Sequence, residues 1–272
     1  MCCMLHLKAP VSQYQTSPVH SVTLDTDIHL VERRLSELSL SCLAVVNHAH
    51  LVGVVSRTDL LRVGRIAALS RESRSDSAVI EQQAGPALTL PHVPVREIMR
   101  SPAFYVQPSD PLANAAKLMM QHHIHRVFVV EHEHLVGVLS TRDLMRAVRD
   151  ARVTQDVATL MSSPVLTVST DAPVAAAIDQ LAQAHVRGLV VVENEWPVGL
   201  FTQAEALAAR SQPATTPVEE VMSYALLCLP PQTPAHRAAA AMNETRARRV
   251  VVVEHREVLG MVTGMDLAAL VL

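Results

Sequence analysis

The sequence has few aromatic residues, few glycines and little net charge, and each shortage excludes a class of function. Seven aromatic residues in a chain of 272 with a net charge of −3 cannot supply the stacking surfaces and basic grooves that bind nucleic acids. None of the 8 glycines lies in a GxGxxG or GxxxxGK(S/T) motif, which excludes glycine-rich phosphate loops of these types. GxSxG and HExxH motifs are also absent. We therefore expect neither an enzyme nor a nucleic-acid-binding protein.

Cysteine pairs and long apolar runs are lacking too. The four cysteines, Cys2, Cys3, Cys42 and Cys228, show no CxxC spacing, which favours reduced thiols. No uncharged apolar run approaches the ~20 residues of a membrane-spanning helix. The first six residues lack the basic flank and the long apolar region of a signal peptide. A cytoplasmic protein without a membrane partner is the expectation.

Aliphatic side chains are abundant instead, and one pattern of them recurs four times. The repeat ends in two apolar residues, a glycine, two apolar residues, Ser or Thr, two variable residues and an acid. Its glycines stand at positions 53, 137, 199 and 260, so the spacings are 84, 62 and 61 residues. The same spacings align Ser17-Pro18, Ser101-Pro102 and Ser163-Pro164, with Tyr224 in the serine place of the fourth copy. We call the copies units 1 to 4.

Each unit has the pattern of a β-α-β-β-α fold. In unit 2 an extended stretch, Ala103–Val106, precedes a helix with Pro111 at its first position. The apolar stretches Val127–Val130 and Leu135–Leu139 predict a hairpin, and a second helix begins after Ser140. A unit of about 45–60 residues is marginally stable alone, so the α/β units are predicted to pair as 1+2 and 3+4.

The predicted domains cover residues 13–62, 96–150, 157–210 and 217–272. Residues 63–95 form an insert or linker that contains Arg65, Arg71 and Arg74. A mobile connector is favoured for this insert, and a dedicated binding arm is the alternative.

The repeated motifs resemble those of cystathionine-β-synthase (CBS) domains. The resemblance rests on the starts Met99-Arg-Ser-Pro102 and Met161-Ser-Ser-Pro164, the hairpins, and the Gly-x-x-(Ser/Thr)-x-x-Asp endings. It implies paired domains with two clefts that bind AMP, ADP or ATP, or else S-adenosylmethionine, NAD or a cyclic dinucleotide. Four copies in one chain are similar to the γ-subunit of AMP-activated protein kinase, in which two modules form a flat disc.

The ending of each repeat has two interpretations. The resemblance implies that its hydroxyl and the helix N–H groups meet a phosphate, and that its acid accepts hydrogen bonds from a ribose. The same spacing before an apolar run is also a helix capping box. Both interpretations stay open at this point.

Unit 2 ranks first as a binding site, because it combines hydroxyls, cations and an acid. Unit 3 ranks last, because the longer side chain of Glu205 reaches into the space that a ribose would fill. The candidate residues are Ser140, Thr141, Arg142, Asp143, His125 and Arg126 in unit 2; Ser56, Arg57 and Asp59 in unit 1; Thr263, Asp266, Arg248 and Arg249 in unit 4; and Thr202, Glu205 and Arg187 in unit 3.

Fourteen histidines raise the question of a metal. The pairs His48/His50 and His132/His134 fall in predicted hairpin turns, and a His-x-His pair can bind zinc or nickel. Without a third ligand, solvated turn histidines are the favoured interpretation, and no metal or cofactor is predicted.

The expected function is non-catalytic regulation. Adenosine nucleotides would bind in the clefts between paired domains, and a partner effector protein would respond to the change. A structural scaffold with empty clefts is the alternative. A monomeric disc and a homodimer are both compatible with four domains in one chain.

Overall fold

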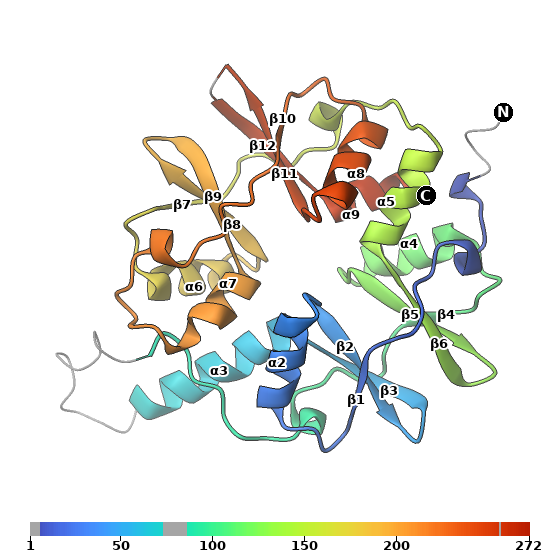
Figure 1. Ribbon diagram of the computed structural model, residues 1–272, viewed down its shortest axis with the longest axis horizontal. Helices are drawn as coiled ribbons and strands as arrows, with labels where there is room; N and C mark the ends of the chain where they lie inside the picture. Colours follow the sequence, from blue (N-terminus) through green and yellow to red (C-terminus); the bar gives the residue numbers. More distant parts are fainter. Residues whose placement is uncertain (1–5, 73–85, 256) are drawn as a thin grey trace.

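The computed structural model describes residues 6–72, 86–255 and 257–272, which form four similar units around a common centre (Figure 1). Each unit has one three-stranded sheet, in which a parallel strand is added to a hairpin. In unit 2, β4 (Tyr105–Val106) runs parallel to β5 (Arg126–Glu131), and β5 pairs antiparallel with β6 (His134–Ser140). Helices α4 (Leu112–Gln121) and α5 (Thr141–Asp150) complete the unit.

The other units repeat this order. Unit 1 contains β1 (Ser21–Thr23), α2 (Ile28–Glu37), β2 (Cys42–Asn47), β3 (His50–Ser56) and α3 (Arg57–Glu72). Unit 3 contains β7 (Thr167–Ser169), α6 (Val174–Gln183), β8 (Gly188–Glu193), β9 (Trp196–Thr202) and α7 (Gln203–Ala208). Unit 4 contains β10 (Cys228–Leu229), α8 (Ala235–Glu244), β11 (Arg249–Glu254), β12 (Glu257–Thr263) and α9 (Gly264–Ala268).

The predicted α/β fold of β-α-β-β-α units is confirmed, with small shifts at element ends. The first strand of unit 2 starts at Tyr105 rather than Ala103. Pro111 is the N-cap of α4 rather than its first helical residue, because its extended backbone forms a β-bridge with Pro10. The predicted apolar face of α4 is buried, and its members Leu112, Ala115, Ala116 and Met119 are 0% exposed.

The predicted insert is in part well packed. Helix α3 runs into it as far as Glu72, whereas α5 in unit 2 ends after ten residues. Residues 73–85, which include Arg74, lie outside the described residues, as do the side chains of Arg65 and Arg71. Beyond them the chain returns along unit 3, where Leu88 N–H donates to the Arg210 carbonyl at 3.0 Å. Leu88 is buried, so this end of the insert is a packed segment rather than a loose connector.

The sheets pair as 1+2 and 3+4. One apolar cluster joins Ala44 of unit 1 to Phe128 of unit 2, and a second joins Val190 of unit 3 to Val251 of unit 4. Each pair is further joined by an exchange of the segments that precede the first strands. We call these the entry segments: residues 10–18, 94–102, 156–164 and 217–225.

Each entry segment packs on the sheet of the partner unit, at the repeated glycine. Backbone bridges join Arg100 to Val54, Ser162 to Met261, Ser223 to Leu200 and Thr16 to Val138. A Cβ atom on Gly260 would lie 2.7 Å from Met161 Sδ and 2.9 Å from the Ser162 carbonyl oxygen. At three positions of the glycine column the neighbouring backbone thus leaves no room for a side chain, whereas Gly137 lies against the side chain of Gln15.

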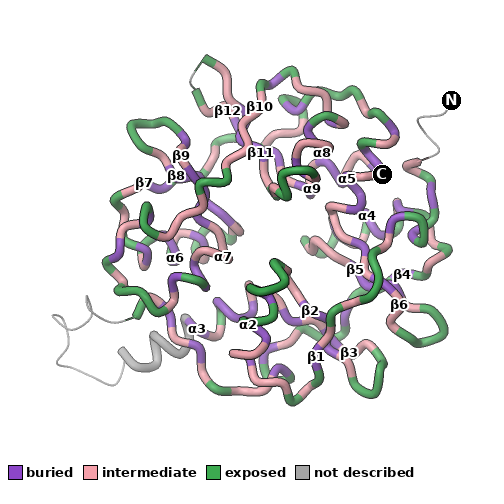
Figure 2. The backbone as a smooth tube through the Cα atoms, in the orientation of Figure 1, coloured by how far each residue is buried: buried purple, intermediate pink, exposed green. Residues whose placement is uncertain are grey.

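The two modules contact each other through helices. Helix α5 of unit 2 packs on α8 and α9 of unit 4, and α3 of unit 1 packs on α7 of unit 3. An ion pair between Arg210 and the buried Glu32, at 3.1 Å, joins units 3 and 1. Buried residues follow these helix contacts and the sheet pairs, whereas the hairpin tips are exposed (Figure 2).

Two glycine variants compare a position that lies against backbone, Gly260, with one that lies against a side chain, Gly137. Gly260→Ala is expected to lower the free energy of unfolding by about 1–3 kcal/mol, because a backbone carbonyl must move. Gly137→Ala is the matched control: its Cβ meets only the flexible Gln15 side chain, at 3.0 Å, so the loss is smaller. Urea denaturation measures both, and equal losses would contradict the close-approach explanation.

Candidate functional site

The central strands β2, β5, β8 and β11 begin at the centre of the ring, so the residues at their starts come together there (Figure 1). The first residues of these strands are Cys42, Arg126, Gly188 and Arg249, which occupy one column of the repeat. In each module an arginine therefore faces a small residue. Arg126 Nη1 lies 3.4 Å from the Cys42 carbonyl oxygen. The Arg249 guanidinium lies against Gly188, where a Cβ would be 2.8 Å from Arg249 Cζ.

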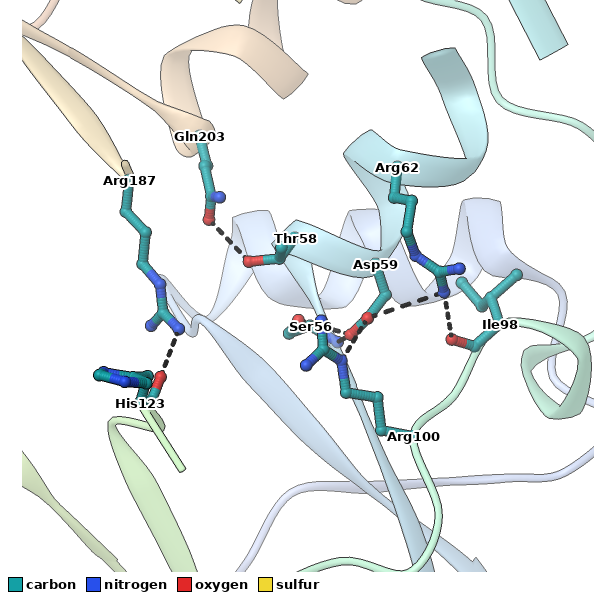
Figure 3. Close-up of polar contacts among 9 residues, drawn as sticks. All are labelled: Ser56, Thr58, Asp59, Arg62, Ile98, Arg100, His123, Arg187 and Gln203. Atoms are coloured by element: carbon teal, nitrogen blue, oxygen red, sulfur yellow. Dashed lines mark hydrogen bonds and ion pairs between the residues drawn. The ribbon is translucent and has the colours of Figure 1, made fainter. Parts of the chain in front are cut away.

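Further arginines reach across between units. Arg187 of unit 3 donates to the His123 carbonyl of unit 2 at 2.9 Å (Figure 3). Arg248 of unit 4 donates to the Ser39 carbonyl of unit 1 at 3.2 Å. All four units thus meet around a group of guanidiniums. We call this group the central arginine cluster: Arg57, Arg126, Arg142, Arg187, Arg248 and Arg249.

The cluster is strongly positive, and its members perturb one another. Desolvation, and then the positive charges of Arg126, Arg57, Arg142 and Arg249, lower the pKa of Arg248 to about 10. Arg248 nevertheless remains exposed to water.

Arg249 is in a similar environment. Desolvation lowers its pKa to about 10; the charge of Glu205 opposes this shift more strongly than the charge of Arg187 adds to it. Its guanidinium makes no hydrogen bond or ion pair with a residue in the described part of the chain. The donors of a half-buried guanidinium without a hydrogen bond are available to an anionic ligand.

His125 lies within this positive region and is uncharged at neutral pH. Desolvation lowers its pKa to about 3, and the charges of Arg187, Arg249, Arg248 and Arg126 act in the same direction. The imidazole therefore offers a neutral donor or acceptor among cations rather than a further charge.

The repeat endings cap the second helix of each unit. In units 2, 3 and 4 the hydroxyl and the acid of the motif form a capping box around the first turn of α5, α7 and α9. In unit 1, the Ser56 N–H and hydroxyl donate to Asp59 Oδ2 at 2.9 and 2.5 Å, which is the acid's half of the same arrangement. The capping interpretation therefore holds fully in units 2, 3 and 4 and in part in unit 1, and any ligand role comes in addition to it.

The four acids differ in what their second oxygen contacts. Asp59 is 0% exposed, and its Oδ1 accepts from Arg100 Nε at 3.0 Å (Figure 3). Asp143 Oδ1 accepts from Arg146 Nη2 at 2.8 Å, and from Thr16 at 3.4 Å. The second oxygens of Asp266 and Glu205 make no hydrogen bond within the described residues, so units 3 and 4 keep an open acceptor.

Several sequence candidates have structural contacts, within a unit or between units. Arg142 donates to the Arg246 carbonyl of unit 4 at 2.9 Å, and Arg57 donates to the Leu35 carbonyl of its own unit at 2.9 Å. The Thr141 hydroxyl would be 3.2 Å from a Cβ on Gly264, which places it in the contact between α5 and α9. Sequence reasoning did not single out Arg100, although it stands inside the repeated Met-x-Ser-Pro motif.

Comparison with known proteins agrees with this architecture. The family model described as CBS domain matches residues 11–65, 95–150, 156–212 and 218–272, which is most of the chain. The chain belongs to the CBS domain family. The resemblance found in the sequence is thereby confirmed, and the four units are CBS domains.

Two solved structures match almost the full length of this CBS protein. MJ1225 of Methanocaldococcus jannaschii, described as a candidate archaeal homologue of γ-AMPK, is 17% identical with a TM-score of 0.79; the match covers 96% of this chain and 99% of that one. An uncharacterized conserved protein of Pyrococcus horikoshii is 20% identical with a TM-score of 0.66, over 97% and 100% of the chains. At these identities the likeness shows the fold, including the arrangement of two modules.

A curated relative matches in part. An uncharacterized 33.4 kDa protein of Thermofilum pendens is 29% identical over 129 residues, which are 43% of this chain and 43% of that protein. The CBS protein described here thus aligns with less than half of that relative. In the described part of the chain, every helix is too short or too polar to cross a bilayer.

The environment of His125 predicts a pH dependence of stability. In the unfolded chain His125 binds a proton below pH 6.5, whereas in the folded chain it stays unprotonated down to about pH 3. Stability from this group is therefore present above about pH 6.5 and is lost as the pH falls toward 3. In urea denaturation at several pH values, His125→Gln should flatten this decline and His20→Gln, at an exposed position, should not. Equal slopes for wild type and His125→Gln would contradict the buried, positive environment.

Proposed function

We propose that this CBS protein is a non-catalytic regulatory sensor that binds adenosine nucleotides, with their phosphates directed into the central arginine cluster. The observation that carries the proposal is the guanidinium of Arg249, which makes no hydrogen bond or ion pair within the described residues and lies at the point where all four units meet. Membership of the CBS family supports adenosine as the nucleoside.

Charge decides which ligand class fits. The cluster gathers six guanidiniums, whereas the net charge of the whole chain is −3, so positive charge is concentrated at this one place. Arginine presents a planar fork that binds phosphate oxygens bidentately. A phosphorylated adenosine such as AMP, ADP or ATP therefore fits better than S-adenosylmethionine, which carries a sulfonium cation and no phosphate.

The ribose acceptors favour the second module over the first. Asp266 and Glu205 keep an oxygen that can accept from ribose hydroxyls, while both oxygens of Asp59 and Asp143 already have donors. We therefore place the first nucleotide in the module of units 3 and 4. This reverses the ranking from sequence, in which unit 2 stood first and unit 3 last.

Signalling to an effector protein would follow from the position of the cluster. The contacts Arg187 to His123 and Arg248 to Ser39 cross between the modules, and a phosphate would compete for these guanidiniums. Such competition gives the ligand a different affinity for the two arrangements of the modules, which is what a switch requires. A scaffold with empty clefts is the alternative function.

Thermal unfolding with nucleotides tests the proposal. A ligand at 100 times its dissociation constant stabilises the folded state by about 2.7 kcal/mol, which raises the melting temperature. AMP, ADP or ATP should produce this shift, S-adenosylmethionine a smaller one, and added salt should weaken it. No shift with any of these ligands, or with NAD, would favour the scaffold.

Two arginine variants localise the effect. Arg249→Gln should abolish most of the shift while changing the ligand-free melting temperature little, because it removes no hydrogen bond and the lost attraction to Glu205 is offset in part by the lost repulsion from Arg187. Arg33→Gln, at an exposed position of α2, is the matched control and should keep the full shift. A full shift in Arg249→Gln would show that the phosphates bind elsewhere.

A further inference from the structure

We propose that Asp27, His29 and His92 form a zinc-binding site on unit 1, away from the central arginine cluster. Each residue offers one ligand atom, and the three atoms lie within 4.8 Å of one another. No other group of three histidine, cysteine or carboxylate ligands gathers in the described ranges of the chain.

The backbone brings two distant segments together at this place. Asp27 is the N-cap of α2, and His29 lies in its first turn. Asp27 forms a β-bridge with Pro94, and Ile28 N–H donates to the Val93 carbonyl at 3.1 Å. His92, near the end of the insert, is thereby held beside the start of α2.

Asp27 can cap the helix and bind a metal at the same time. Its Oδ1 accepts from the His29 N–H at 2.8 Å, which leaves Oδ2 facing His92 Nδ1 at 3.4 Å. Two ligand atoms with zinc bonds of about 2.0–2.1 Å at a tetrahedral angle lie ~3.3 Å apart. The pair is therefore already at the spacing of two zinc ligands.

His29 supplies an independent indication of a missing partner. Its Nε2 is buried and has no hydrogen-bond partner among the described residues. A buried imidazole nitrogen without a partner is costly, and a metal ion would satisfy it. The His29 and His92 rings are stacked with centroids 4.2 Å apart. Tetrahedral ligation places such centroids ~5 Å apart with both ring nitrogens directed at the ion, so the exposed His92 must rotate out of the stack when zinc binds.

Two imidazoles and one carboxylate are a ligand set that suits zinc, with water in the fourth position. The histidines of the hairpin turns lack such a set. The His50 and His134 rings are stacked with centroids 5.7 Å apart, but no third ligand joins them. The proposed site would fasten the end of the insert, and with it the entry segment of unit 2, to helix α2 of unit 1.

Zinc binding to the full-length, untagged chain tests the site. After removal of metal with a chelator, isothermal titration with zinc chloride should show one ion bound per chain. His92→Ala and His29→Ala should each weaken this binding by about tenfold or more, since even residues behind metal ligands contribute that much. Asp27→Asn should also weaken it, while its amide oxygen still caps the helix.

Matched variants separate the site from other histidines. His20→Ala, at an exposed position, and the double variant His50→Ala/His134→Ala should bind zinc like the wild type. Melting temperatures measured without zinc identify any variant that has lost its fold. If a histidine variant does not fold, Asp27→Asn, which keeps the helix cap, still tests the site. No zinc binding by the wild type, or unchanged binding after His29→Ala and His92→Ala together, would overturn the proposal.

Discussion

The structure depends on the close approach of each entry segment to the glycine of its partner unit. Gly53, Gly199 and Gly260 lie under a methionine and a backbone carbonyl of the neighbouring entry segment, at distances that leave no room for a Cβ atom. Because the exchange is reciprocal, neither unit of a pair has a complete surface without the other. This contact sets the angle between the paired sheets, and the sheet angle points the starts of all four central strands toward one place.

That convergence creates the electrostatic character of the molecule. A chain with a slight negative charge concentrates guanidiniums where its units meet, and half of its paired strand starts are small residues that make room for them. Arg126 lies over Cys42, and Arg249 lies over Gly188. The sheets and helices bury aliphatic side chains, and this burial drives folding. Its favourable free energy offsets the repulsion within the central arginine cluster. An anion that neutralises the cluster would stabilise the fold and couple the two modules.

Much of this fold could be predicted from the sequence, because the four copies of the repeat can be aligned with one another. The spacing of the glycines and the Ser-Pro pairs was sufficient for the units, their pairing and the CBS family. The sequence could not settle whether Asp143 faces a ligand or a donor, because Arg146 of the same helix could point elsewhere and the second donor, Thr16, comes from the entry segment of unit 1. Nor could it bring His92 beside His29, since 62 residues, which include most of the insert, separate them in the chain. Capping and ligand binding use the same residues at the same spacing, so only the contacts of the second carboxylate oxygen distinguish the units.

The central claim is that the arginines at the centre hold the phosphates of a nucleotide. A crystal structure of the chain with AMP tests it most directly. The account predicts AMP in the module of units 3 and 4, with phosphate oxygens within hydrogen-bond distance of Arg249 and the ribose on the open oxygen of Asp266 or Glu205. AMP bound with its phosphate directed away from the central arginine cluster, or a centre without nucleotide at saturating AMP, would contradict it.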